Sequence, residues 1–336
     1  MKTSDTASKR PRLESEDEDD DDDELQELAT SARRRRGRIR QEIERLDRPS
    51  VPPPEDLSSS LSPPPEDVPP PEDVPPPEDV PPPEDVPSPP EDVISRPHSV
   101  LKLSDPIFET KLPFPSVGYV VPTRFHLDGE GDEENWFYTG REKFTELFDK
   151  FQHLIKDRRY TTLTLYGTRG YGKSHLLAAL VCYLAAKEER VVYIPDCRRF
   201  MKNPVDDMIP AMLFAWADDE NKQKRIMALD TQDDISRFFR SQKKVIFVVD
   251  QTNAFEHEVG DNGETEKKKA EVRMWLDRCR ARHKAIFGSS ANNPTILSEA
   301  LRQSDHELMY VYGGLSVVNI KINNSFTWKR TVLTTI

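Results

Sequence analysis

Residues 161–175 read TTLTLYGTRGYGKSH, and this stretch decides the fold class of the chain. Positions 167–174 match the G-x-x-x-x-G-K-[ST] signature of a phosphate-binding P-loop without a mismatch. The run 161–166 is rich in β-branched and apolar residues, and 174–187 has the apolar spacing of a buried helix. A strand that leads through a glycine loop into a helix directs backbone N–H groups and the positive end of the helix dipole at phosphate oxygens. The pattern predicts a nucleoside triphosphate site; the alternative is a chance glycine turn before a core helix.

The residue types of the loop have separate roles in this prediction. Lys173 is expected to reach the β- and γ-phosphates and to act in catalysis, and the Ser174 hydroxyl is expected to ligate Mg²⁺. The predicted cofactors are therefore ATP and Mg²⁺, with ATP favoured over GTP because no guanine-reading N-K-x-D follows the third predicted strand. The other predicted nucleotide-binding residues of this stretch are Gly167, Thr168, Arg169, Gly170, Tyr171, Gly172 and His175.

Composition limits the remaining possibilities. The chain has 336 residues, but its 29 prolines and 32% charged residues are concentrated enough in the first hundred positions to leave about one ordinary folded domain. The net charge of −12 argues against general nucleic-acid affinity, so a nucleic-acid partner has little support. No apolar run reaches the roughly 20 residues of a membrane span, and no signal-peptide core is seen. Three cysteines without metal-ligand spacing fit a reducing, intracellular compartment.

The region 1–50 is predicted to be disordered, first acidic and then arginine-rich. Residues 14–24 read ESEDEDDDDDE, and like charges at this density repel one another and favour an extended chain. Arginines occupy positions 33–36, 38 and 40. They indicate a nuclear import signal or a nucleic-acid patch; the alternative is a solvated helix over 24–46 in which Arg and Glu alternate.

Residues 51–96 form a proline-rich linker, in which four consecutive copies of PPPEDV fill 63–86. Proline triplets fix φ and remove backbone donors, which predicts a polyproline II rod. The rod is either a stiff spacer or a ligand for a proline-reading protein partner. The following stretch, 97–135, mixes prolines with aromatic residues and is expected to be an extended arm lying on the domain rather than a core element.

Residues 136–314 alternate between apolar strands and helical segments. Strands are predicted at 161–166, 190–194, 244–250, 285–289 and 308–312, and helices at 141–156, 174–187, 204–218, 231–242, 264–282 and 295–303. Apolar strands separated by helices predict an α/β fold: a P-loop NTPase with a mostly parallel five-stranded sheet sandwiched between helices, preceded by a long disordered N-terminal region. The tail 315–336 is polar and continues none of this pattern.

Asp250 follows the apolar run VIFVV, where a metal-binding Walker B aspartate is expected on a strand neighbouring the P-loop strand. Its alternative role is to cap a turn. The next residue, Gln251, stands where hydrolytic enzymes of this class usually carry Glu; glutamine can orient a water but cannot accept its proton. Gln251 is therefore predicted to be the catalytic water-positioning residue of a slow enzyme, unless Glu256 or Glu258 replaces it.

Two further positions complete the predicted site. The string GSSANN ends the fourth predicted strand, and Ser290 within it is expected to contact the γ-phosphate; the alternative is a turn rich in Ser and Asn. Arg302 is placed like an arginine finger, a catalytic residue that would act on a neighbouring subunit of a homo-oligomer.

Several strings together resemble a known family. YTGRE, residues 138–142, resembles the G-R-E box of STAND and AAA-like ATPases, which implies that Gly140 and Arg141 bind the nucleotide. GTRGYGKSHLLAAL, RVVYIPDCR, VIFVVDQ and FGSSANN are similar to the NTPase domain of Crinkler and retrotransposon-hot-spot type effectors. Such effectors often join this domain to a C-terminal nuclease or kinase-like domain and act in host nuclei, which implies secretion; the 22 residues after Gly314 predict that this domain is absent.

Three functions compete at this point. The leading one is an ATP-binding, slowly hydrolysing, nucleotide-dependent switch. The second is a non-hydrolysing, nucleotide-bound scaffold that recruits protein partners through its N-terminal region. The third, a small-molecule kinase, requires a lid, and no arginine-rich lid segment follows the P-loop helix.

Overall fold

The computed structural model describes residues 18–48, 96–118, 121–125, 127–128, 135–256, 261–290 and 301–312. Four predicted features lie outside these residues: the PPPEDV repeats, the position Glu258, the string 291–293 and the tail 315–336.

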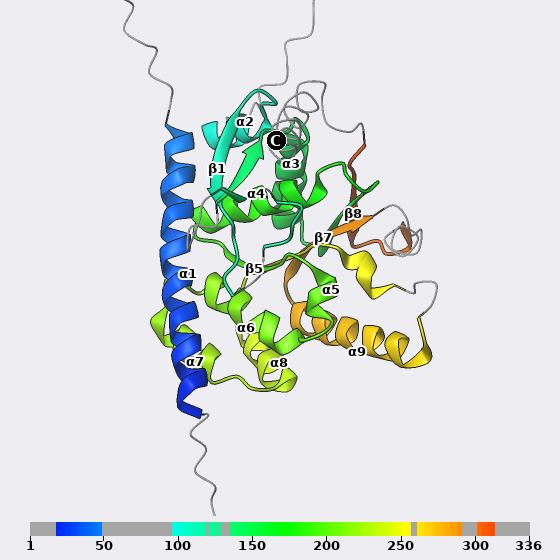
Figure 1. The fold of residues 1–336 in the computed structure, drawn as a ribbon. Helices are drawn as coiled ribbons and strands as arrows, with labels where there is room; N and C mark the ends of the chain where they lie inside the picture. Colours follow the sequence, from blue (N-terminus) through cyan, green and yellow to red (C-terminus); the bar gives the residue numbers. More distant parts are fainter. Residues whose placement is uncertain are drawn as a thin grey trace, which may run out of the picture.

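The centre of the molecule is a five-stranded parallel sheet (Figure 1). Its strands run in the order β5 (Arg190–Ile194), β6 (Val245–Val249), β7 (Lys284–Ser290), β4 (Thr162–Gly167) and β8 (His306–Tyr310). Every pairing between neighbours is parallel. The predicted sheet between helices is confirmed, and each strand lies within two residues of its predicted position.

Helices connect these strands and cover both faces of the sheet. They are α3 (Lys143–Lys156), α4 (Lys173–Ala186), α5 (Cys197–Phe200), α6 (Pro204–Ala215), α7 (Glu220–Met227), α8 (Gln232–Ser241), the 3-10 turn η1 (Thr252–Phe255) and α9 (Gly263–Arg280). Strand β6 shows how the two faces are filled. Ile246 and Val248 enter the core that contains α3 and α4, whereas Phe247 and Val249 enter the core that contains α8 and α9. Because alternate residues of a strand face opposite ways, a strand covered on both faces must be apolar throughout.

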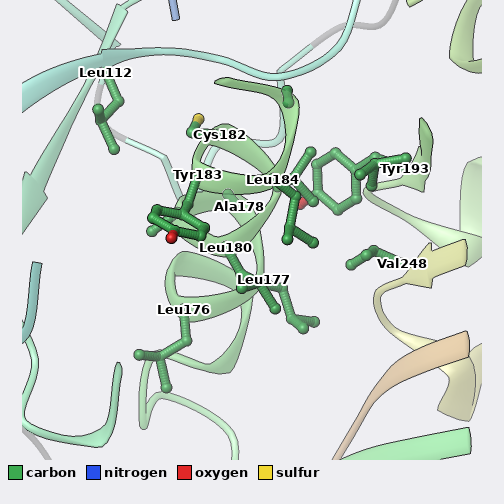
Figure 2. Close-up of a cluster of buried hydrophobic side chains, with 14 of the residues drawn as sticks. Leu112, Leu176, Leu177, Ala178, Leu180, Cys182, Tyr183, Leu184, Tyr193 and Val248 are labelled. Atoms are coloured by element: carbon green, nitrogen blue, oxygen red, sulfur yellow. The ribbon is translucent and has the colours of Figure 1, made fainter. Parts of the chain in front are cut away.

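Helix α4 is apolar all round because it is enclosed on every side. Figure 2 shows its leucines pointing in different directions, with Leu112 on one side and Tyr193 and Val248 of the parallel sheet on the other. His175 is the one residue of α4 outside the buried set. The helix that carries the P-loop lysine is therefore fixed firmly in the fold.

The stretch 97–135 is not an arm lying on the surface, which corrects the prediction. It contributes α2 (His98–Ser104), β1 (Glu109–Pro113) and β2 (Leu127–Asp128), and the two strands pair antiparallel with β3 (Asn135–Thr139) in the order β1-β3-β2. Leu112 and Phe114 are fully buried. Pro106, Pro115 and Pro122 lie between these short elements and Pro113 ends β1, so this part of the chain can still supply core residues.

The prediction of disorder over 1–50 is wrong for α1 (Glu18–Asp47), a 30-residue helix. Figure 1 shows it along one side of the molecule, where it packs against α4, α6 and α7. Ala32, Ile39 and Ile43 are fully buried in this contact. The alternative interpretation, a solvated helix over 24–46, predicted the helix correctly but did not predict that one of its faces is buried.

The arginines of α1 help to attach it. Arg36 donates hydrogen bonds to the carbonyls of Phe214 and Ala215, at the end of α6. Arg33 binds the Gln223 side chain and pairs with Glu220 of α7. Within the described residues, no helix combines the length and the apolar character needed to cross a bilayer.

Candidate nucleotide site

The P-loop joins the end of β4 to the start of α4. Gly170 and Gly172 have φ values of +92° and +80°, in the left-handed region that favours glycine. Gly172 caps α4, and a Cβ atom on it would lie 2.5 Å from a guanidinium nitrogen of Arg141. Thr168 and Arg169 are exposed, so this part of the loop is open to solvent. The loop has the shape of an anion cradle at a helix N-terminus.

Lys173 points back into the loop. Its ammonium group donates hydrogen bonds to the carbonyls of Gly167 at 2.6 Å and Thr168 at 2.8 Å, and the residue is only 9% exposed. Burial lowers the pKa of Lys173, and the nearby Asp250 carboxylate works against this shift. A cation is thus held inside the loop without a direct carboxylate partner among the described residues.

Ser174 and Asp250 meet at the carboxyl edge of the sheet. The Ser174 side chain lies close enough to the Asp250 carboxylate to favour its charged form, and the Gln251 backbone N–H donates to Asp250 Oδ1 at 2.9 Å. Asp250 is 1% exposed, and this burial raises its pKa, against the effect of Arg124. A hydroxyl beside a carboxylate is the oxygen donor set that Mg²⁺ uses when phosphates complete its shell.

One detail of the predicted arrangement is corrected. Strand β6, which carries Asp250, is not adjacent to β4, because β7 lies between them. Asp250 crosses this gap because the β7 residue that it faces is Gly288, where a Cβ atom would lie 2.6 Å from Asp250 Oδ1. In the described part of the chain, no group of three or more His, Cys, Asp or Glu side chains could hold a metal without phosphate ligands.

Arg124 is a site residue that the sequence did not reveal. Its Nη2 atom lies 3.1 Å from Asp250 Oδ2 and also donates to the Pro195 carbonyl, and its Nη1 atom lies 3.7 Å from Asp196 Oδ2. Arg124 belongs to the stretch 121–125, which has no hydrophobic periodicity, and Phe125 directly follows it. No local signal connects it with Asp250.

The end of β7 brings two serine hydroxyls to the site. Ser290 is the register partner of Gly167, and Ser289 is the partner of Tyr166. Consecutive residues of a strand face opposite sides, so Ser290 shares the α4 face with the P-loop and Ser289 lies on the other face. Both hydroxyl oxygens are buried, and neither has a hydrogen-bond partner among the residues that the structure describes. A buried hydroxyl without a partner is costly, which makes Ser290 a candidate ligand contact.

Gln251 has a left-handed backbone with φ +62° and ψ +38°. Such a conformation is uncommon outside glycine and occurs often at functional sites. Its side-chain carbonyl accepts a weak hydrogen bond from Arg198 at 3.4 Å. Glu256, the alternative base that lies within the described residues, is buried. The pKa of Tyr166 is raised mainly by burial, with smaller contributions from Tyr312 and from the charge of Glu256.

The remaining predicted residues lie at different distances from the loop and in different environments. Arg141 is half-buried with its guanidinium against Gly172, and desolvation lowers its pKa. Gly140 donates its N–H to the carbonyl of Phe108, which lies between α2 and β1, at 2.8 Å. The His175 ring packs among aromatic side chains, 4.8 Å from Phe125, which turns it away from the phosphate cradle. Tyr171 is partly buried on the core, and Arg302 is exposed.

The parallel sheet, the glycine loop before α4 and the Ser174–Asp250 contact define a P-loop NTPase fold. No family model matches the chain, and no curated protein matches it. Among solved structures, it is similar to a DNA replication initiation factor, with 16% identity, coverage of 56% of this chain and 51% of that one, and a TM-score of 0.35. It is also similar to PCH-2 of C. elegans (13% identity, 50% and 43% coverage, TM-score 0.32) and to AMPPCP-bound DnaA from Aquifex aeolicus (15% identity, 63% and 56% coverage, TM-score 0.32). The chain spans about half the length of these structures. The resemblance to Crinkler-type effectors stays a prediction.

Proposed function

We propose that this protein is a Mg²⁺-dependent, ATP-binding P-loop NTPase that hydrolyses ATP slowly and acts as a nucleotide-dependent switch. The observation that carries the proposal is the position of the buried Asp250 carboxylate at the P-loop, where it faces Gly288 of β7 and where the Ser174 side chain favours its charged form. The fold brings these two oxygen donors together from α4 and the end of β6, although they are far apart in the sequence.

The chain's own residues fit a bound Mg²⁺–ATP. The loop amides and Lys173 would hold the phosphates, and Ser174 and Asp250 would hold the metal, which neutralises phosphate charge when it is bound. Arg141 supports this fit, because its Nε atom is buried without a hydrogen-bond partner in the described part of the chain and its guanidinium lies against Gly172. A buried cation at the loop is what an anionic ligand would stabilise.

The residue after Asp250 accounts for the slow hydrolysis. The Gln251 side chain can orient a water by hydrogen bonding but cannot accept a proton from it at neutral pH. Arg302 would then act in trans on a neighbouring subunit, since its exposed position on this chain is compatible with contact to another copy.

The decisive experiment measures Mg²⁺–ATP binding and turnover by the purified full chain in parallel. Lys173→Ala should lose both, whereas Lys156→Ala, which removes an exposed lysine at the end of α3, should lose neither. Binding that persists at full strength in Lys173→Ala would contradict the proposed site.

Gln251 also favours a second candidate, the non-hydrolysing scaffold that recruits partners through its proline-rich and charged N-terminal region. In that case the wild-type chain binds Mg²⁺–ATP but shows no turnover above the Lys173→Ala background. Bound nucleotide would still stabilise the fold, by about 2.7 kcal/mol at a hundredfold excess over Kd.

A further inference from the structure

The Asp250 carboxylate is held by three groups from different parts of the chain. Gln251 donates its N–H to Oδ1 at 2.9 Å, and Arg124 Nη2 lies 3.1 Å from Oδ2. Ser174 is the third group, and its side chain favours the charged form of Asp250. The Arg124 guanidinium therefore binds one of the two carboxylate oxygens of Asp250 that could bind a metal ion.

The residue after Arg124 fixes this arrangement to the P-loop helix. Phe125 is buried, with its ring 4.8 Å from the His175 ring and 5.1 Å from the Trp136 ring. His175 directly follows Ser174 in the first turn of α4. The short stretch 121–125 thus contacts Asp250 through Arg124, and it contacts His175, the neighbour of Ser174, through Phe125.

A guanidinium and Mg²⁺ compete for the same carboxylate. Two cations on one buried carboxylate repel each other strongly, because little water is present to screen them. Arg124 has other acceptors within reach, since it already donates to the Pro195 carbonyl and its Nη1 atom lies 3.7 Å from Asp196 Oδ2. It can leave Asp250 without losing all of its partners.

We propose that Arg124 is a positioning residue that holds Asp250 in the metal-free protein and must leave it when Mg²⁺ binds with nucleotide. Metal binding is then coupled to movement of residues 121–125, and the charge of Arg124 sets the Mg²⁺ concentration at which the site fills. This inference rests on the proposed nucleotide site.

The test compares ATP affinity in Mg²⁺ and in EDTA for the full-length wild type, Arg124→Gln and Arg124→Lys, with a titration of Mg²⁺ at fixed ATP. Arg124→Gln keeps a hydrogen-bond donor beside Asp250 but removes the competing charge. It should lower the half-saturating Mg²⁺ concentration about tenfold and leave affinity in EDTA within about threefold of wild type. Arg124→Lys keeps the charge and should remain near wild type.

Arg198→Ala is the matched control, because among the described residues Arg198 contacts Asp196 and Gln251 at the same edge but forms no hydrogen bond or ion pair with Asp250. It should leave the Mg²⁺ dependence unchanged. Loss of ATP affinity in Arg124→Gln to the same degree in Mg²⁺ and EDTA would make Arg124 a phosphate ligand and overturn the proposal. An unchanged Mg²⁺ titration in Arg124→Gln would also overturn it. Failure of the proposed function is separate, since there the wild type binds no ATP in either condition.

Discussion

The Arg36 guanidinium on α1 donates a hydrogen bond to the carbonyl of Ala215, the last residue of α6, at 2.6 Å. It also donates to the carbonyls of Phe214 at 3.2 Å and Glu189 at 2.9 Å. Cations at helix C-termini satisfy carbonyls that have no helical partner and interact favourably with the helix dipole. Burial lowers the pKa of Arg36 to about 10, which leaves it charged at neutral pH. This arginine of the basic cluster therefore acts within the fold.

Replacing Arg36 with Ala should destabilise the protein by about 2 kcal/mol, because buried carbonyls lose their donor. The loss is limited because Arg190 also donates to the Ala215 carbonyl. Urea unfolding of the two proteins measures the difference. Arg34→Ala is the control, since Arg34 is exposed on the same helix and should change stability by less than about 0.5 kcal/mol. Equal effects of the two substitutions would mean that α1 is not docked as described.

Gly172→Ala should weaken ATP binding much more than Gly170→Ala. Both glycines have positive φ, so an alanine at either position costs about 1–2 kcal/mol in backbone strain. Only at Gly172 would the added Cβ collide with the Arg141 guanidinium, because nothing lies within 4 Å of a Cβ at Gly170. Calorimetric titration with Mg²⁺–ATP should show at least about a tenfold larger loss for Gly172→Ala. Similar losses would show that backbone conformation alone matters.

Ser290→Ala should reduce ATP affinity about ten- to a hundredfold, because a hydrogen bond from a hydroxyl to an anionic phosphate is worth about 1.5–3 kcal/mol, whereas Ser289→Ala should not reduce it. The two serines are adjacent and both have buried hydroxyls without a partner, but only Ser290 is paired with Gly167 on the face of the P-loop. The same titration distinguishes them. If Ser289→Ala is the more harmful change, the assignment of faces to the site is wrong.

Gln251→Glu should raise Mg²⁺–ATP turnover by about tenfold or more, because a positioned carboxylate can accept the proton of the attacking water. Steady-state phosphate release measures this effect. Gln251→Asn controls for loss of the native side chain, and it tolerates the left-handed backbone at this position. Turnover that stays at the wild-type level in Gln251→Glu would place the catalytic water elsewhere, with Glu256 as the next residue to test.

His283 should make stability depend on pH. Its Nε2 atom lies 3.0 Å from the Phe239 carbonyl, and its Nδ1 atom is buried without a partner. Burial lowers its pKa, against the effect of the Phe239 carbonyl, so the unfolded chain binds a proton more readily than the folded one. The stabilisation is fully present above the unfolded pKa of about 6.5 and is lost as pH falls below it.

Urea unfolding at pH 7.5 and pH 5.5 tests this sign. Wild type should lose more stability on acidification than His283→Gln, which cannot titrate. His98→Gln removes an exposed histidine and should follow the wild-type pH dependence. A steeper loss in His283→Gln than in wild type would contradict the prediction.

The sequence by itself determined the fold class and the centre of the site. An apolar strand, a glycine loop and an apolar helix are all local patterns, so residues 161–187 identify β4, the P-loop and α4 without tertiary information. The position of Asp250 at the end of a strand could be predicted in the same way, because it directly follows an apolar run typical of a buried strand.

Only the tertiary structure decided which residues from outside this domain complete the fold and the site. The arginines of α1 look solvated in the sequence because their partners are backbone carbonyls, which no pattern of residue types marks. Arg124 lacks a signal for the same reason, since its ion pair with Asp250 joins positions far apart in the chain. Insertion of β7 between β4 and β6 likewise depends on strand order, which hydrophobic periodicity does not encode. Local patterns follow from neighbouring residues, whereas these contacts exist only once the whole chain has packed.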